Sequence, residues 1–170
     1  MPKFNIYPYF EFQEAKWHKF KGVKAYTGFI ITDTLNYVSN DLISQAKEIE
    51  LSIILTNDEY IRPLKKEYLG LDQATNVLSF PSLEFQEGKL ISQHEVTEGH
   101  AYLGEIIVSF NTLERESKEQ NKSFNYHYTH LIIHSVLHLL GFDHINNDEA
   151  ARMEELEEQL LRKLLNEYHE

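Results

Sequence analysis

One short stretch of the chain carries three histidines at the spacing of a metal site. His134 and His138 are four residues apart, and His144 follows after Gly141. An α-helix places residues i and i+4 on one face, so the first two imidazoles can reach the same ion. The helix is expected to end at Gly141, because glycine takes the left-handed cap conformation without steric cost. The chain can then turn and return His144 to the same point.

The ligand types indicate a catalytic ion. Three protein ligands leave a fourth coordination position for water, as in catalytic zinc sites, and a chain without cysteine cannot build a closed thiolate site. We expect one zinc ion, although imidazole also suits other divalent transition metals. The simpler alternative is a buried helix whose histidines hydrogen-bond to neighbours. Among the apolar residues 131–140, however, neutral imidazoles would be costly without a partner for their nitrogens.

Residues next to the histidines bear on the chemistry of the site. In the zinc-peptidase pattern HExxHxxGxxH, a glutamate follows the first histidine and activates the metal-bound water. Ser135 holds that position here, and a hydroxyl is no general base at neutral pH, which disfavours a peptidase. Asp143 is the nearest carboxylate, and it could take a proton, orient a ligand imidazole or simply shape the turn. His130 lies roughly 12 Å along the helix axis from His138, too far to share an ion with it.

Four segments of the chain carry motifs that occur together in one known protein family. Residues 75–81 are similar to TDVLSFP, and residues 103–109 are similar to LGDIxIS. The histidine stretch, residues 134–144, is similar to HGxLHLxGxDH, and residues 153–157 are similar to ME-x-LE. In this order the segments resemble the YbeY proteins, bacterial metal-dependent endoribonucleases of ribosomal RNA maturation.

The resemblance implies an α+β fold and a nuclease activity. The expected architecture is one domain, residues 1–170, with a small, mostly four-stranded mixed sheet packed with helices and a zincin-like core. The implied function is zinc-dependent hydrolysis of RNA phosphodiester bonds in small-subunit ribosomal RNA maturation and ribosome quality control. The alternatives are a non-catalytic, metal-stabilised ribosome assembly factor and, less favoured, a zinc peptidase.

One departure from the family falls at a position taken to matter for activity. The family carries an arginine there, and this chain has Leu69. A leucine cannot stabilise the charge of a phosphoryl transition state, so a nearby cation would have to do so. Thr75 and Asn76, at the start of the next predicted strand, could line a substrate-binding cleft, or they could merely hydrogen-bond the end of that strand. The candidates for substrate binding are Arg62, Lys65, Lys66, Thr75 and Asn76.

The net charge opposes unaided RNA binding. The chain carries 16 Lys and Arg against 27 Asp and Glu, a formal net charge of −11, whereas nucleic-acid binders usually show a basic footprint. Basic residues gather in residues 16–24 and 62–66, and acidic residues gather in 148–158. One face of the molecule could therefore be basic while its far end is acidic; the alternative, which we favour for the first basic group, is that the lysines merely solvate surface turns. Weak autonomous affinity, with the small ribosomal subunit or a ribosome-associated protein supplying placement, fits these numbers.

Composition indicates an ordinary globular protein. The chain is 42% hydrophobic and 25% charged. Its first residues contain no apolar segment of the secretory type, and the longest near-apolar run, residues 131–142, is too short to span a bilayer. We therefore expect a cytoplasmic protein without a membrane partner.

Hydrophobic patterning predicts alternating strands and helices. Residues 4–12 predict a first strand, and Pro8 confines it to a sheet edge. Further predicted strands are residues 49–56, 76–80 and 103–110, and predicted helices are residues 26–38, 58–68, 111–120 and 124–140. Residues 82–101 predict a mobile loop, and Asp148 is expected to cap a last amphipathic helix. The apolar stripe of that helix is Met153, Leu156, Leu160 and Leu164.

Overall fold

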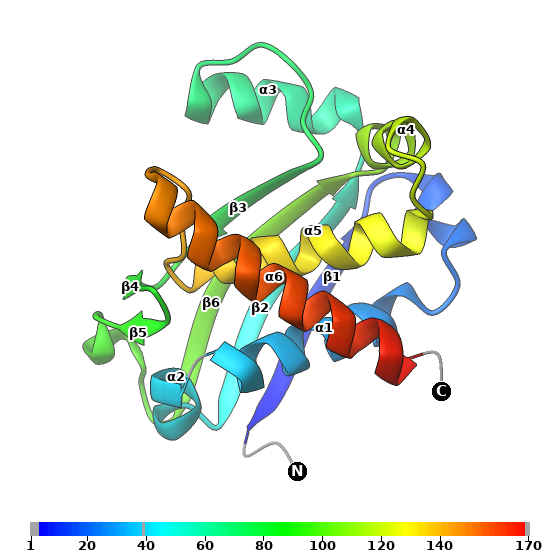
Figure 1. Cartoon of the computed structure of the whole chain (residues 1–170). Helices are drawn as coiled ribbons and strands as arrows, with labels where there is room; N and C mark the ends of the chain where they lie inside the picture. The colour runs from blue at the N-terminus through cyan, green and yellow to red at the C-terminus, as the bar shows by residue number, and fades with distance from the viewer. Residues whose placement is uncertain (1–3, 39, 169–170) are drawn as a thin grey trace.

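A four-stranded sheet lies at the centre of the protein, with most of the helices on one of its faces. The structure is a computed structural model and describes residues 4–38 and 40–168. The strands are β1 Asn5–Phe12, β2 Glu48–Thr56, β3 Val77–Pro81, β4 Phe85–Gln86, β5 Lys89–Leu90 and β6 His100–Ser109. The helices are α1 Val23–Val38, α2 Asn40–Gln45, α3 Asp58–Leu69, α4 Phe110–Glu119, α5 Phe124–Leu139 and α6 Asn147–Tyr168, with 3₁₀ turns η1 Ala15–Lys19 and η2 Gln93–Glu95. Figure 1 shows α1, α5 and α6 in front of the sheet and α3 apart from them at its upper end.

The sheet is mixed, as the sequence predicts. Its strand order is β1-β2-β6-β3, in which β1, β2 and β6 run parallel and β3 runs antiparallel to β6. The first strand lies at an edge, where Pro8 does not interrupt a central ladder. The α+β architecture with a small four-stranded sheet is therefore confirmed.

Alternation along the strands produces two apolar faces of unequal size, because successive side chains point to opposite sides of a sheet. The larger face packs against α1 and α5, and α6 packs in turn on these two helices. Together they form the main core, to which β2 contributes Ile53 and Leu55. On the opposite face, α3 packs through Ile61 on a smaller cluster. The smaller cluster consists of Ile54, Ile61, Leu78 and Ile107. The predicted stripe of α6 is also confirmed, since Met153, Leu160 and Leu164 are buried and Leu156 packs against the main core.

Two local predictions differ from the structure. Residues 82–101 are not a plain loop, because they contain the hairpin β4–β5, the turn η2 and the start of β6. The cap of α6 is Asn146, whose Oδ1 accepts a hydrogen bond from the backbone N–H of Glu149 at 2.9 Å. Asp148 lies inside the first turn instead, where its charge favours the helix dipole. Successive cap-forming residues, Asn146 to Asp148, leave the sequence ambiguous at this point.

The helix α5 ends at Leu139, just before Gly141, where the sequence predicts that it stops. Gly141 has a φ of +84°, in the left-handed region. Its N–H donates to the carbonyl of His138 at 3.0 Å, and the N–H of Phe142 donates to the carbonyl of Leu137 at 3.0 Å. These two bonds are those of a Schellman motif, which satisfies the last carbonyls of the helix.

The hairpin β4–β5 packs directly on this glycine. A Cβ atom at Gly141 would lie 2.3 Å from the carbonyl oxygen of Phe85, far inside van der Waals contact. The N–H of Gly88 donates to the carbonyl of Leu140 at 2.8 Å, which fastens the hairpin turn to the end of α5. Position 141 therefore requires glycine for its backbone conformation and for the space it leaves.

A pair of glycine substitutions separates these two requirements. Gly70 ends α3 at a φ of +73°, but nothing lies within 4 Å of the Cβ that it would carry. Gly70→Ala should lower the free energy of unfolding by about 1–2 kcal/mol, the cost of a left-handed alanine. Gly141→Ala should lower it by about 1–3 kcal/mol more, because the hairpin must move. Urea unfolding of the metal-free variants measures both, and equal losses would contradict the packing argument.

Candidate metal centre

Three histidines converge at the end of α5. One ring nitrogen from each of His134, His138 and His144 lies within 4.8 Å of the others. The Nε2 atoms of His134 and His138 are 3.0 Å apart, and the ring of His144 is centred 5.2 Å from that of His138. Nitrogens on a tetrahedral zinc ion, each about 2.0–2.1 Å from it, are separated by about 3.3 Å. The three residues therefore fit a metal ion after small ring movements.

His138 is partly buried at this site. Burial lowers the pKa of His138 below its ordinary 6.5, and the neighbouring His134 lowers it further. A depressed pKa keeps the imidazole neutral, which is the form that binds a metal ion. The site is thus poised to bind a cation rather than to carry positive charge of its own.

Glu157 of α6 joins two histidines of α5. Its Oε1 lies 2.5 Å from Nδ1 of His134, and its Oε2 lies 2.7 Å from Nε2 of His130. Burial alone would raise the pKa of Glu157, but the hydrogen bonds with His130 and His134 outweigh it and lower that pKa to about 2. The ionised carboxylate accepts the Nδ1 proton of His134. The Nε2 atom of His134 is then free to face the other two imidazoles.

The helical periodicity of α6 could have identified Glu157 as a residue of interest. The inward face of α6 carries Met153, Leu160 and Leu164, and Glu157 falls on the same face at helical spacing. A single carboxylate in an apolar stripe is costly unless a partner satisfies it. Its partner His134 is 23 residues away in the chain, so local spacing could not identify the pair.

Asp143 contacts the third histidine. Its Oδ1 accepts a hydrogen bond from the backbone N–H of His144 at 2.7 Å and lies 3.2 Å from Nδ1 of the same residue. This contact occupies Nδ1 of His144 and leaves its Nε2 available to a metal ion. Of the roles considered for Asp143, orienting a ligand imidazole has direct geometric support.

A cleft of about 700 Å³ opens beside the imidazoles. Thr75, Asn76 and Leu69 all line it, together with β3 and the turn that follows α5. A second hollow of about 550 Å³ shares Pro81, Phe85, His138 and Gly141 with the cleft. His138 therefore borders open space on two sides.

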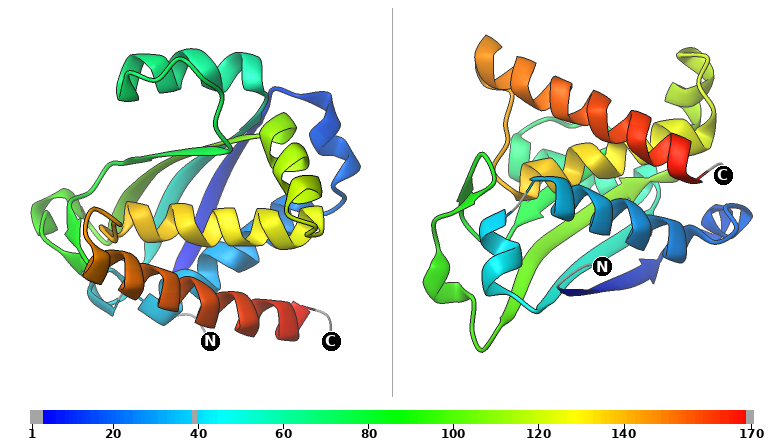
Figure 2. Two further views of the ribbon diagram at one scale, coloured as in Figure 1. Left: turned by 45° about the horizontal axis from the view of Figure 1, so that its top comes forward. Right: turned by 60° about the horizontal axis from the view of Figure 1, so that its bottom comes forward.

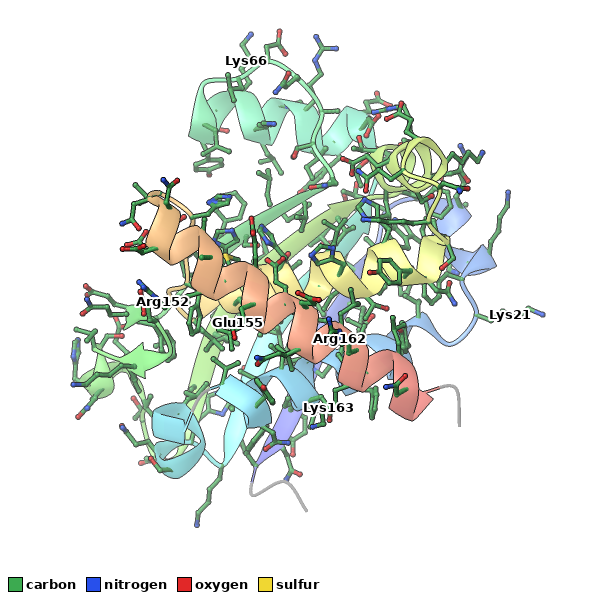
Figure 3. All side chains as sticks on the ribbon, in the orientation of Figure 1. Lys21, Lys66, Arg152, Glu155, Arg162 and Lys163 are labelled. Atoms are coloured by element: carbon green, nitrogen blue, oxygen red, sulfur yellow. The ribbon has the colours of Figure 1, made fainter. Side chains whose placement is uncertain are left out.

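The candidate cations lie outside the cleft lining. Arg62 forms an ion pair with Asp72 at 2.9 Å and borders a separate hollow. Figure 3 shows Lys66 at the top of α3, pointing away from the sheet. Among the described residues that line the cleft, none is a lysine or an arginine, and Leu69 occupies the wall instead. The structure thus does not bring Arg62, Lys65 or Lys66 to the histidines.

Asn76 is fixed by a hydrogen-bonded chain from α4 and α5. Its Nδ2 donates to Oε1 of Glu116 at 2.8 Å, and Nε2 of His127 lies 3.1 Å from the same oxygen. The carbonyl of Asn76 also accepts the backbone N–H of Ser109 at 2.9 Å. Asn76 therefore both lines the cleft and bonds a strand end, so the two expected roles coincide.

Replacing Glu157 tests its role in orienting His134. Glu157→Gln keeps the size of the side chain but can accept from only one of the two histidines, so zinc affinity should fall about tenfold or more. Glu154→Gln removes the same charge from an exposed position on α6 and should leave the affinity unchanged. Competition with a chromophoric chelator measures both affinities. Equal affinities for the two variants would exclude the orienting role.

The depressed pKa of His138 predicts a pH dependence of stability. The folded, metal-free protein binds fewer protons at His138 than the unfolded chain does, because burial disfavours the imidazolium. The free energy of unfolding should therefore fall as the pH drops through 6.5. His138→Gln removes the titrating group and should flatten this decline. Urea unfolding of both metal-free proteins from about pH 7.5 to 5.5 tests it, and an undiminished slope in the variant would refute it.

Comparisons with known proteins identify the family of this chain. The model of a family described as Endoribonuclease YbeY matches residues 16–165. Proteins named Endoribonuclease YbeY are 44% identical over 119 residues in Rhizobium meliloti (strain 1021) and 45% identical over 115 residues in Sinorhizobium fredii (strain NBRC 101917 / NGR234). The matched regions cover 70% and 68% of this chain but only 66% and 62% of those relatives, which is less than two thirds of their length.

A solved structure supports the fold, and no membrane-spanning helix is found. The solution structure of TM1509 from Thermotoga maritima matches with a TM-score of 0.56 and 22% identity, over 96% of this chain and 92% of that one. None of the helices in the described residues is both long and apolar enough to cross a bilayer. On the family match and the identities to its named relatives, the chain belongs to the YbeY family.

Proposed function

We propose that this protein is a zinc-dependent endoribonuclease whose whole chain, residues 1–170, acts as one hydrolase domain. The observation that carries the proposal is the convergence of three imidazoles beside an open cleft, in a member of a family described as an endoribonuclease. The proposed substrate is small-subunit ribosomal RNA. The proposed setting is its maturation and quality control in the cytoplasm, with the small subunit or a ribosome-associated protein as partner.

Different side chains would have separate roles in the reaction. His134, His138 and His144 would hold one ion, which when bound polarises a phosphodiester and lowers the pKa of water. Glu157 orients the first of these imidazoles, and Asp143 orients the third. Both contacts of Asp143 use Oδ1, so Oδ2 is the atom that would accept a proton.

Two features of the cleft suit an endonuclease. The cleft and the second hollow both border His138, so a chain could pass the ion and continue on either side. Thr75 and Asn76 lie in the wall, and the amide of Asn76 is turned toward Glu116, which leaves its Oδ1 to accept a ribose hydroxyl. Lys65 lies one helical turn before Leu69 and on the same face of α3. We therefore propose Lys65 as the cation nearest to the substrate, ahead of Lys66 and Arg62.

A zinc peptidase is disfavoured by the surroundings of Ser135. The Oγ of Ser135 is buried and has no hydrogen-bond partner among the described residues, so it faces the core. No base follows the first histidine to activate water in the peptidase manner. A non-catalytic assembly factor remains the second candidate, because Leu69 places an apolar group in the cleft wall at the arginine position.

Two substitutions distinguish the nuclease from the assembly factor. His138→Ala should abolish cleavage of single-stranded RNA and weaken zinc binding. Leu69→Arg should raise the cleavage rate by about tenfold or more, because it supplies charge for the transition state. Leu71→Arg is the matched control, since it adds the same charge at an exposed position outside the cleft lining.

Gel-resolved cleavage of labelled RNA, with thermal unfolding of the same proteins, measures the outcome. Cleavage by the wild type that survives His138→Ala would refute the metal-dependent nuclease. A zinc-loaded wild type that cleaves no RNA, together with a loss of thermal stability in His138→Ala, would favour the assembly factor.

A further inference from the structure

The arginines of this acidic chain form ion pairs, whereas one group of its lysines does not. All four arginines of the sequence form ion pairs: Arg62, Arg115, Arg152 and Arg162. By contrast, four lysines within residues 16–24 make no ion pair with any described residue and are exposed. These residues, here called the lysine surface, are Lys16, Lys19, Lys21 and Lys24.

The lysine surface stands on a rigid base. Trp17 lies between its first two lysines, is fully buried, and donates its indole N–H to the carbonyl of Thr56 at 2.9 Å. The ring of Phe20 is centred 5.6 Å from that of Phe124 and 5.0 Å from that of Tyr128. The segment is thus fastened to the first two turns of α5, and the lysines project from an ordered support. Figure 3 shows Lys21 projecting outward at the end of the molecule where α5 begins.

Aromatic faces are interleaved with the charges. Lys24 places its Nζ 5.6 Å from the ring centre of Phe12, and the ring of His18 stacks on the same phenylalanine at 5.3 Å. Lys21 and Lys24 line a hollow of about 410 Å³ together with these rings. A basic groove beside aromatic faces is the arrangement that proteins use to hold single-stranded nucleic acid without sequence preference.

Lys24 occupies an unfavourable position in its own helix. Lys24 lies in the first turn of α1, which has no acidic residue, and a cation there opposes the helix dipole. The only nearby carboxylate that the segment itself contributes is Glu14, whose Oε2 accepts the backbone N–H of Lys16. Four exposed lysines without an ion pair lie within residues 16–24 of a chain of net charge −11, and this local concentration of positive charge suits an external anion.

We propose that the lysine surface is a second RNA-binding surface, which holds the phosphate backbone of a longer substrate away from the metal centre. The identity of the ligand rests on the proposed function. The helix α5 separates the two sites: it is 16 residues long, roughly 24 Å at 1.5 Å per residue, with the lysine surface at its start and the histidines at its end. The surface selects RNA that is long enough to reach both.

Charge-matched pairs of substitutions test the proposal. Lys21→Gln with Lys24→Gln should weaken the binding of a long single-stranded RNA by roughly tenfold at 0.1 M salt and reduce the slope of log affinity against log salt by about 1.4. Binding of a short oligonucleotide that cannot span α5 should not change. Lys47→Gln with Lys89→Gln removes the same charge from exposed, unpaired positions elsewhere and should leave both affinities unchanged. Fluorescence anisotropy of cleavage-resistant 2′-O-methyl RNA on the zinc-loaded protein measures all of them.

Several outcomes would overturn the proposal. One is an equal loss in the control pair, which would mean that net charge alone matters. Another is an equal loss for the short oligonucleotide. A third is a loss of binding to phosphatidylserine vesicles with RNA binding intact, which would assign the surface to a membrane. A wild type that binds long RNA through these lysines but cleaves none would refute the nuclease and still support the lysine surface.

Discussion

The candidate site depends on the way α5 ends. Gly141 adopts a left-handed conformation that closes the helix after His138, and the reversal of the chain brings His144 back to within reach of the two helical imidazoles. The same absence of a side chain lets the backbone of Phe85 approach, so the hairpin β4–β5 docks there and forms part of the wall of the second hollow. One backbone geometry therefore sets both the ligand positions and the space beside them.

A second constraint is supplied from the next helix. α6 runs back beside α5 in the opposite direction (Figure 2), and this return places Glu157 against His130 and His134. A buried carboxylate is stable there only because both of its oxygens are bonded, and the free energy of that network depends on the helices keeping their register. The orientation of His134, a candidate metal ligand, is thus coupled to the packing of α6 against α5.

Features of the candidate site that depend on residues close together in the sequence could be predicted, whereas contacts between distant segments could not. The spacing of His134, His138 and Gly141 determines the face of a helix and its end, because helical geometry acts over a few residues. The partner of His134 comes from α6 and depends on how two helices pack, which no short pattern encodes. The prediction that residues 82–101 form a loop was wrong for a similar reason, since the hairpin there is stabilised by backbone hydrogen bonds to the distant end of α5.

Net charge and local charge lead to different conclusions about nucleic acid. A total charge of −11 repels a phosphate backbone over long distances only at low salt, because screening at physiological salt confines the effect of each exposed charge to about 8 Å. Within that distance, what matters is whether a cation is already paired. The arginines are paired, whereas the lysines before and at the start of α1 are not, and the acidic residues of α6 lie on a different element. An acidic chain can therefore present a basic surface, and its affinity for RNA would then depend steeply on salt and on the length of the strand.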